Sequence, residues 1–312
     1  MDTAMAAVDW MRTHLRLKVG VLHVTAFRPF PGAAIATALK NCRAVAILER
    51  TDNPLAKDNP LTLEIKAAFA DAVSGAPYYR RPDRMPRLYS GVYGLGSRDV
   101  RAADFIAAVE HMADCGRRFF SLGAVHRSAL ARTHDPDVRP PGSYSLRGHS
   151  IGGFGSVATN KLLATLLADV LGLQVQAYPK YGSEKKGLPT TYYLTAAPTR
   201  VRAHSELAQV EFVAVHDANA FADTEPLAGL ADGGVLYVQC RAAEVARLTT
   251  QLPMEAIARR GIAVYLSDAA GIGRDLATQA DLALRMQGVA LLGAFLRISP
   301  LVAVREFESE AL

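Results

Sequence analysis

Cysteine is scarce in this chain of 312 residues. Its three cysteines, Cys42, Cys115 and Cys240, lie far apart, and none belongs to a Cys-x-x-Cys pair. An iron–sulfur cluster of the usual four-cysteine kind is therefore excluded, and no structural zinc site is expected. Because disulfides form in oxidising compartments, this sparing use of cysteine favours a reducing one. We expect a cytoplasmic protein.

Long apolar runs are also missing. No stretch approaches the 18 or more consecutive apolar residues that indicate a membrane-spanning helix. Residues 1–24 contain acidic side chains early and lack a clean apolar core followed by a small-residue cleavage site, so no signal peptide is expected. The sequence predicts a soluble chain that is not exported.

The positive charge is spread along the chain. The formal net charge is +5 and the isoelectric point is about 9.1, yet no block of five or six like charges occurs. The densest basic stretch, YYRRPDRMPRL at 78–88, is interrupted by prolines and by Asp83. This pattern favours a solvated loop or a subunit contact over nucleic-acid binding. Phosphate-bearing small molecules or an acidic partner surface suit the overall charge better.

Motifs of a self-contained catalytic centre are absent as well. We find no nucleophile elbow, no His-Glu-x-x-His zinc motif, no paired-carboxylate motif and no Cys–His nucleophile. The eight histidines are scattered, and His23 and His216 lie within apolar strand patterns, which favours core residues over catalytic bases. The sequence therefore predicts no catalytic residue and no metal ligand, and indicates part of an enzyme.

What is present is an alternation of short β-branched runs with helical patterns, which is typical of α/β proteins with parallel sheets. The length suits two domains. In the first, at 1–126, strands are expected at 18–24, 44–50, 87–94 and 118–125, and helices near 32–41, 61–73 and 101–114.

A stretch at 127–145, with three prolines and little apolar periodicity, predicts a connector. The second α/β domain, at 146–312, is expected to have strands at 173–179, 189–197, 211–217, 233–239 and 262–268 and a closing helix at roughly 275–298.

Glycines gather in SIGGFGSVATNKLL, residues 150–163, directly before a helical apolar stripe that ends near Gly172. Free N–H groups at a helix N-terminus attract phosphate, and glycines let the ligand approach the backbone. The candidate anion-binding residues are Gly152, Gly153, Gly155, Ser156 and Thr159. The pattern is neither a full Gly-x-Gly-x-x-Gly fingerprint nor a P-loop, so a simple tight turn stays an alternative.

Two further loops strengthen the anion hypothesis. AYPKYGSEKKGLPTTYY, at 177–193, follows a strand and is expected at the same sheet end as the glycines. Its candidate residues are Lys180, Ser183, Lys185 and Lys186, and its alternative is a solvated hairpin-like turn. SDAAGIGRDLA, at 267–277, repeats the strand–glycine–helix pattern. Three such loops favour a nucleotide-like ligand or a close partner surface.

GHSIGGFGSVATNK and YPKYGSEKKGLPT together resemble the gamma domain of the thiamine-dependent 2-oxoacid:ferredoxin oxidoreductases, which include pyruvate:ferredoxin oxidoreductase. The first half resembles the second domain of the same enzymes at 17–56, with its Arg28-Pro29-Phe30 turn and Glu49-Arg50-Thr51 strand end, and at 91–100. The resemblance implies a transketolase-C-terminal-like α/β domain followed by a Rossmann-like α/β gamma domain.

The resemblance also implies the activity. The family reaction converts a 2-oxoacid and coenzyme A to acyl-CoA, carbon dioxide and low-potential electrons for ferredoxin or another acceptor, or runs in reverse. This chain lacks the thiamine domains and the cysteine-rich domain, so partner chains are expected to hold thiamine diphosphate, magnesium and iron–sulfur clusters in a hetero-oligomer. The glycine and lysine loops are expected to cradle the coenzyme A phosphates, and Arg28, Phe30 and Arg50 to have structural or interface roles.

Two alternatives stay open. The chain could be a structural or assembly subunit with no role toward coenzyme A. It could instead be a free-standing nucleotide-binding protein, but a nicotinamide site is disfavoured because Gln174 and Gln176 lie where an acidic residue is expected.

Overall fold

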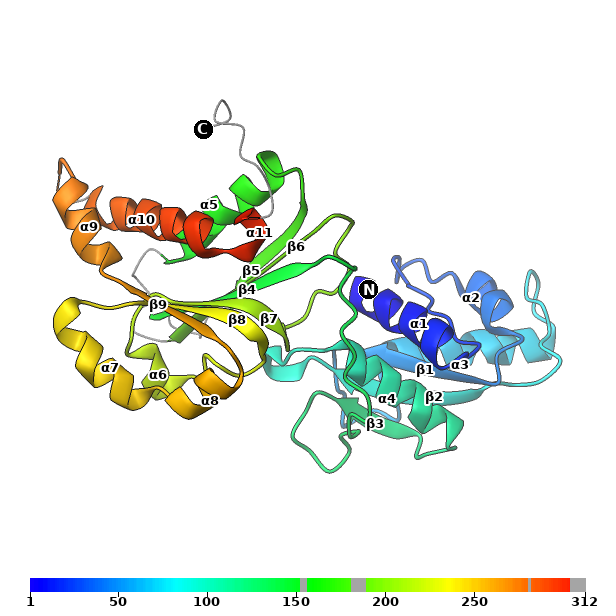
Figure 1. The fold of residues 1–312 in the computed structure, drawn as a ribbon. Coiled ribbons are helices and arrows are strands. Elements are labelled where there is room, and N and C mark those ends of the chain that lie inside the picture. The colour runs from blue at the N-terminus through cyan, green and yellow to red at the C-terminus, as the bar shows by residue number, and fades with distance from the viewer. Residues whose placement is uncertain (152–155, 181–188, 280–281, 304–312) are drawn as a thin grey trace. The chain divides into compact units, whose positions relative to one another are not determined.

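The computed structural model describes residues 1–151, 156–180, 189–279 and 282–303, which form two compact units (Figure 1). The first unit comprises Met1–Val138 and Arg202–Glu206, and the second comprises Arg139–Val201 and Leu207–Leu312 as far as they are described. Each unit combines helices with a β-sheet, so the predicted α/β class is confirmed.

The first unit is built on a parallel sheet in the order β1-β2-β3. Ala44 pairs with Arg87, and Ser90 pairs with Phe119. Its elements are α1 (Asp2–His14), α2 (Gly32–Leu39), β1 (Ala44–Glu49), α3 (Pro60–Ser74), β2 (Arg87–Tyr93), η1 (Leu95–Ser97), α4 (Ala102–Ala113) and β3 (Phe119–Leu122).

Two apolar layers flank this sheet. Ile35 of α2 and Phe69 of α3 pack against Ile47 of β1 on one face. On the other face, Ala108 of α4 packs against Phe120. Helix α3 begins here because the Glu49 carboxylate accepts the backbone N–H groups of its first turn, at 2.7 Å from Leu61 and 3.0 Å from Thr62.

The second unit has a six-stranded mixed sheet in the order β5-β6-β4-β7-β8-β9. Strands β4, β7, β8 and β9 are parallel, whereas β6 runs antiparallel to both β4 and β5. Its elements are β4 (Tyr144–Ile151), α5 (Ser156–Asp169), β5 (Gln174–Lys180), β6 (Pro189–Ala197), β7 (Val210–Val215), α6 (Ala220–Asp223), β8 (Leu230–Gln239), η2 (Ala242–Glu244), α7 (Val245–Gln251), α8 (Met254–Arg259), β9 (Ala263–Ser267), α9 (Ala269–Leu276), α10 (Ala283–Ile298) and α11 (Pro300–Ala303).

Helices cover both faces of this sheet (Figure 1). Leu167 of α5 and Phe295 of α10 pack with Phe212 on one face. Leu248 of α7 and Ile257 of α8 pack on the other. None of the described helices is long and apolar enough to cross a membrane.

Four sequence expectations are corrected. Residues 18–24 form no strand, because no neighbouring strand is available for backbone hydrogen bonds. The segment connects α1 to α2, and its Val19 and Val24 pack against two different hydrophobic clusters. Strand β4 was not predicted, because its sequence is largely polar although it lies in the centre of the sheet. The closing helix expected at roughly 275–298 is α10, which begins later, at Ala283, and ends at Ile298 as expected. The expected all-parallel pattern fails at β5 and β6, which pair antiparallel.

Candidate functional site

The candidate site lies at the end of the second unit's sheet where β4 ends. Ile151, the last residue of β4, pairs with Pro189, the first residue of β6. Lys180, the last residue of β5, pairs with Thr191. The strands that carry the two predicted anion-binding segments therefore end at one edge of the sheet, and the parallel strand β7 ends there too, since Val215 pairs with His149.

Three of the predicted site residues fall on described elements. Ser156 is the first residue of α5, Thr159 lies half-buried in its first turn, and Lys180 is exposed at the end of β5. Helix α10 approaches Thr159 closely, because a methyl group added to Gly288 would lie 2.6 Å from the Thr159 Oγ1 atom. The remaining predicted residues lie outside the described residues: Gly152, Gly153, Gly155, Ser183, Lys185 and Lys186.

Two histidines and an asparagine are among the buried polar side chains below this edge. His149 of β4 and His216, directly after β7, are 5% and 3% exposed, and Asn160 of α5 is 2% exposed. The Asn160 amide nitrogen lies 3.3 Å from His216 Nε2. Neither ring nitrogen of His149 has a hydrogen-bond partner in the structure described here, and the same holds for His216 Nδ1.

Burial keeps both rings neutral. Desolvation, with smaller contributions from Arg147 and His216, lowers the pKa of His149 to about 3. Desolvation also lowers the pKa of His216 to about 4. Both imidazoles are therefore uncharged at neutral pH, so they add no positive charge beneath the candidate anion site.

The sequence predicted part of this buried polar group. The sequence predicted that His23 and His216 are core residues. The prediction is confirmed for His216, which is buried, and is wrong for His23, which is exposed in a segment without regular structure. Asn160 was missed. Its spacing to Leu163 and Leu167 places it on the apolar stripe of α5, and that spacing was the available signal.

The third predicted loop does not have the expected geometry. Gly271 and Gly273 lie inside α9 and not before it. The Asp268 carboxylate already caps this helix, since it accepts the Gly271 N–H at 2.7 Å. Gly273 instead allows α10 to pack closely, because an added methyl group would lie 2.5 Å from the Gln287 backbone nitrogen.

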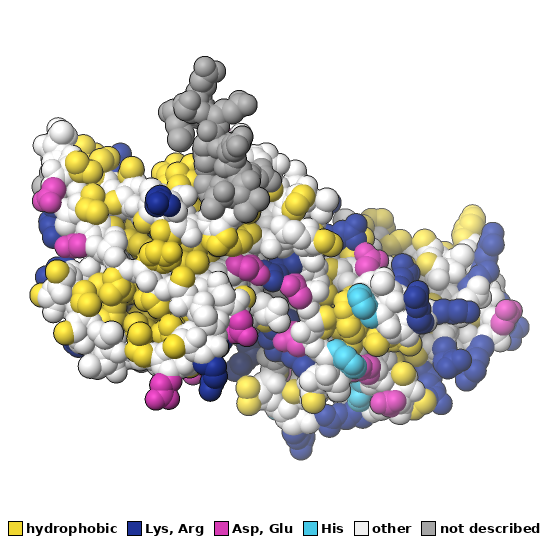
Figure 2. Space-filling view, viewed as in Figure 1, with side chains coloured by type: hydrophobic (Ala, Val, Ile, Leu, Met, Phe, Trp, Pro, Cys, Tyr) yellow, Lys and Arg dark blue, Asp and Glu magenta, His cyan; other side chains and the backbone are white. Residues whose placement is uncertain are grey.

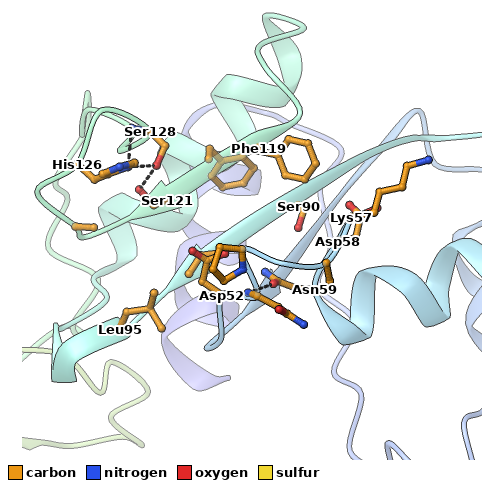
Figure 3. A pocket seen from close by; sticks show the side chains of 16 residues that line it. Asp52, Lys57, Asp58, Asn59, Ser90, Leu95, Phe119, Ser121, His126 and Ser128 are labelled. Carbon is orange, nitrogen blue, oxygen red and sulfur yellow. Dashed lines mark hydrogen bonds between the residues drawn. The ribbon is translucent and has the colours of Figure 1, made fainter.

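The first unit holds a cavity of about 490 Å³ that is lined in part by residues of β2 and β3 (Figure 3). Its walls are the segment from Asp52 to Asn59 and the segment from Ala124 to Ser128. The side chain of Asp58 is completely buried in ion pairs with Lys66 and Arg118. The polar groups of this cavity are thus largely engaged within the chain.

A short hydrogen-bonded series borders the same cavity. The Ser128 hydroxyl lies 2.7 Å from His126 Nδ1, and Ser121 Oγ lies 2.9 Å from Ser128 Oγ (Figure 3). No carboxylate orients His126 among the described residues, so the series lacks the third member of a nucleophilic triad. The cavity admits a small molecule but presents no assembled nucleophile.

The described residues do not fit a metal ion or an iron–sulfur cluster. No three His, Cys, Asp or Glu side chains come together as a metal site in the described ranges. The three cysteines lie at separate places: Cys42 is half-buried, Cys115 is exposed and Cys240 is buried. An iron–sulfur cluster needs several thiolates at one point.

Comparison with known proteins gives two family matches in sequence order. Residues 1–105 match pyruvate:ferredoxin oxidoreductase core domain II, and residues 145–311 match the pyruvate ferredoxin/flavodoxin oxidoreductase model. These matches place the chain among oxidoreductase-related α/β proteins. More particularly, the chain belongs to the pyruvate ferredoxin/flavodoxin oxidoreductase family, which confirms the resemblance inferred from the sequence.

The curated relatives are distant in sequence and much longer than this chain. A pyruvate-flavodoxin oxidoreductase of Enterobacter agglomerans is 27% identical over 88% of this chain and 23% of its own length. One from Klebsiella pneumoniae is 29% identical, with the same coverages. A solved pyruvate oxidoreductase subunit from Thermotoga maritima covers 52% of this chain and 79% of its own, at 20% identity and a TM-score of 0.39. The chain thus spans about a quarter of the length of these curated relatives.

Proposed function

We propose that this chain is a subunit of a thiamine-dependent 2-oxoacid:ferredoxin oxidoreductase, or of one with another low-potential acceptor, and that it helps to bind coenzyme A. The observation that supports this most directly is the strand register, because Ile151–Pro189 and Lys180–Thr191 pairing brings the strand ends before both predicted segments to one edge. Converging loops at the carboxyl ends of parallel strands commonly bind ligands in α/β folds.

The proposed division of labour follows from what the residues can do. Thiamine diphosphate, held by a partner chain, supplies the carbanion chemistry when it is bound. In this chain, the N–H groups at the start of α5 and the Ser156 and Thr159 hydroxyls donate hydrogen bonds to phosphate. Lys180, Ser183, Lys185 and Lys186 add charge and donors, and Gly152, Gly153 and Gly155 let the phosphate reach the backbone. Bound this way, coenzyme A is positioned and takes no proton from this chain.

The remaining parts of the proposal concern organisation. We assign 1–126 to the transketolase-C-terminal-like domain, 127–145 to a connector and 146–312 to the Rossmann-like gamma domain. Partner chains carry the thiamine diphosphate, magnesium and iron–sulfur clusters, and the complex works in the cytoplasm.

Removal of the lysine charges tests the coenzyme A role. In the purified complex, the triple change Lys180→Ala, Lys185→Ala and Lys186→Ala should raise KM for coenzyme A about tenfold or more, because losing charge-assisted contacts costs at least about 1.4 kcal/mol. The kcat at saturating coenzyme A and the subunit composition should stay unchanged.

The control is the double change Lys18→Ala and Lys40→Ala, which removes positive charge from the first unit and should leave KM for coenzyme A as it is. An unchanged KM in the triple variant, with the complex intact, contradicts the coenzyme A role and supports the alternative of a purely structural or assembly subunit.

A further inference from the structure

The arginine loop, residues 78–87, is a basic surface that the proposed function does not use. It has four arginines, Arg80, Arg81, Arg84 and Arg87, against a single acidic residue, Asp83. All four arginines are exposed. Figure 2 shows Lys and Arg side chains gathered over the end of the first unit that carries α2 and α3. The loop lies between α3, which ends at Ser74, and β2, which begins at Arg87.

The backbone of the arginine loop is anchored. Pro82 and Pro86 are buried, and Tyr79 packs on the small cluster of Ala36, Ala68 and Ala72 between α2 and α3. The Arg87 N–H donates to the Arg43 carbonyl at 3.0 Å. The arginines are therefore presented from a fixed platform, which lowers the conformational entropy lost when a partner binds.

The guanidinium groups of this loop have no acidic partners in the described chain. Many other arginines form ion pairs with carboxylates of described residues, among them Arg28, Arg101, Arg118, Arg132, Arg139, Arg202, Arg241 and Arg260. Arg80, Arg81 and Arg84 form none with the described residues, although Asp83 lies between them in the sequence. The nearby Asp71 carboxylate is directed toward Tyr79 and raises the pKa of that phenol after the larger effect of burial.

One aromatic residue of this surface is held outward at a conformational cost. Tyr78 has a φ of +71° and is 95% exposed. A bulky residue seldom adopts the left-handed region, and such strain tends to occur at functional positions. Met85 is exposed beside it in sequence, at 45%.

The residue types identify the kind of partner. Arginine, tyrosine and methionine are enriched in protein interfaces, whereas lysine and glutamate, which dominate ordinary solvated surfaces, are absent from the loop. A net charge of about +3 on the loop fits an acidic surface. Exposed apolar groups at Tyr78 and Met85 fit a protein better than a polyphosphate backbone.

We propose that the arginine loop is a docking surface for the acidic face of a partner protein, with Tyr78 as its apolar anchor. This proposal goes beyond the coenzyme A role and does not depend on it. The arginines supply long-range attraction and orientation, and Tyr78 is buried on contact.

The test is photo-crosslinking in the native source. The tagged full-length chain carries p-benzoylphenylalanine in place of Tyr78, and covalent adducts are identified by mass spectrometry. The same photoreactive residue in place of Val125, which is 87% exposed in the same unit, is the control site. We expect one predominant adduct, with an acidic peptide of a different protein.

Charge reversal distinguishes docking from chance contact. Arg80→Glu, Arg81→Glu and Arg84→Glu together should reduce the adduct yield at least about tenfold, since both steering and contact are reversed. The control triple Arg247→Glu, Arg259→Glu and Arg274→Glu changes exposed arginines of the second unit and should leave the yield unchanged. Arg80→Gln, Arg81→Gln and Arg84→Gln should give an intermediate loss, and circular dichroism checks that each variant is folded.

The proposal is overturned by any of three results. These are a yield at Tyr78 no greater than at Val125, an adduct that nuclease removes, and an adduct with a second copy of this chain. None of these results bears on KM for coenzyme A, so failure here and failure of the proposed function are separable.

Discussion

At the scale of residues, the second unit buries two uncharged histidines beneath the edge where its parallel strands end. His149 and His216 contribute no charge there. Burying them costs free energy, because their rings lose hydrogen bonds to water that Asn160 replaces only in part. The candidate anion site must therefore draw its positive charge from the lysines and from the start of α5.

Because of these histidines, the unfolding free energy should decrease as the pH is lowered. Their folded pKa values, about 3 for His149 and about 4 for His216, lie below the unfolded value of about 6.5. Below about pH 6.5 the unfolded chain binds protons that the folded chain excludes, so their contribution is complete above that pH and is lost as the pH falls. Each histidine adds up to about 1.4 kcal/mol per pH unit to the slope.

Chemical denaturation of the wild-type chain and of His216→Gln between about pH 5 and pH 7 measures this slope. The variant should lose about half of the histidine contribution to the slope. Equal slopes for wild type and His216→Gln would refute the assignment of His216 as a buried neutral group.

At the scale of elements, the sequence predicted most strands and helices because their apolar periodicity agrees with their burial. Strand β6 was predicted at 189–197 and is found there, and α2, α3 and α4 lie close to their expected limits. Failures occurred where tertiary partners decide. The segment 18–24 has strand-forming residues but no strand to pair with, and β4 has polar residues but lies between β6 and β7.

The candidate site could be predicted only in part from the sequence. Glycines and lysines near strand ends were visible as a pattern, and the register of β4, β5 and β6 is compatible with one site. Asp268 was not foreseen as the cap of α9, because a strand–glycine–helix pattern cannot reveal whether the chain itself occupies the helix N-terminus.

The contact between α9 and α10 gives an element-scale prediction. Gly273→Ala places a methyl group 2.5 Å from the Gln287 nitrogen, in backbone that cannot turn aside, and should lower the unfolding free energy by about 1–3 kcal/mol. Gly293→Ala in α10 meets nothing within 4 Å and should raise it by up to about 1 kcal/mol. Denaturant titration of both variants measures the difference, and a neutral Gly273→Ala would contradict close packing at this point.

At the scale of the whole molecule, the chain spans about a quarter of its curated relatives, and its three cysteines cannot hold the clusters that the proposed reaction requires. In the proposed function, partner chains supply the thiamine diphosphate and the electron path. Two surfaces of this chain are proposed as binding sites: the sheet edge of the second unit for coenzyme A and the arginine loop for an acidic partner.

The most direct test of the subunit assignment is purification of the tagged chain from its native source under non-denaturing conditions, with mass spectrometry of the co-purifying proteins and assays for iron and thiamine diphosphate. We predict a thiamine-binding chain and a cysteine-rich chain in fixed ratio to this one, with both cofactors present. Recovery of the chain alone, monodisperse and free of iron and thiamine diphosphate, would contradict the subunit assignment.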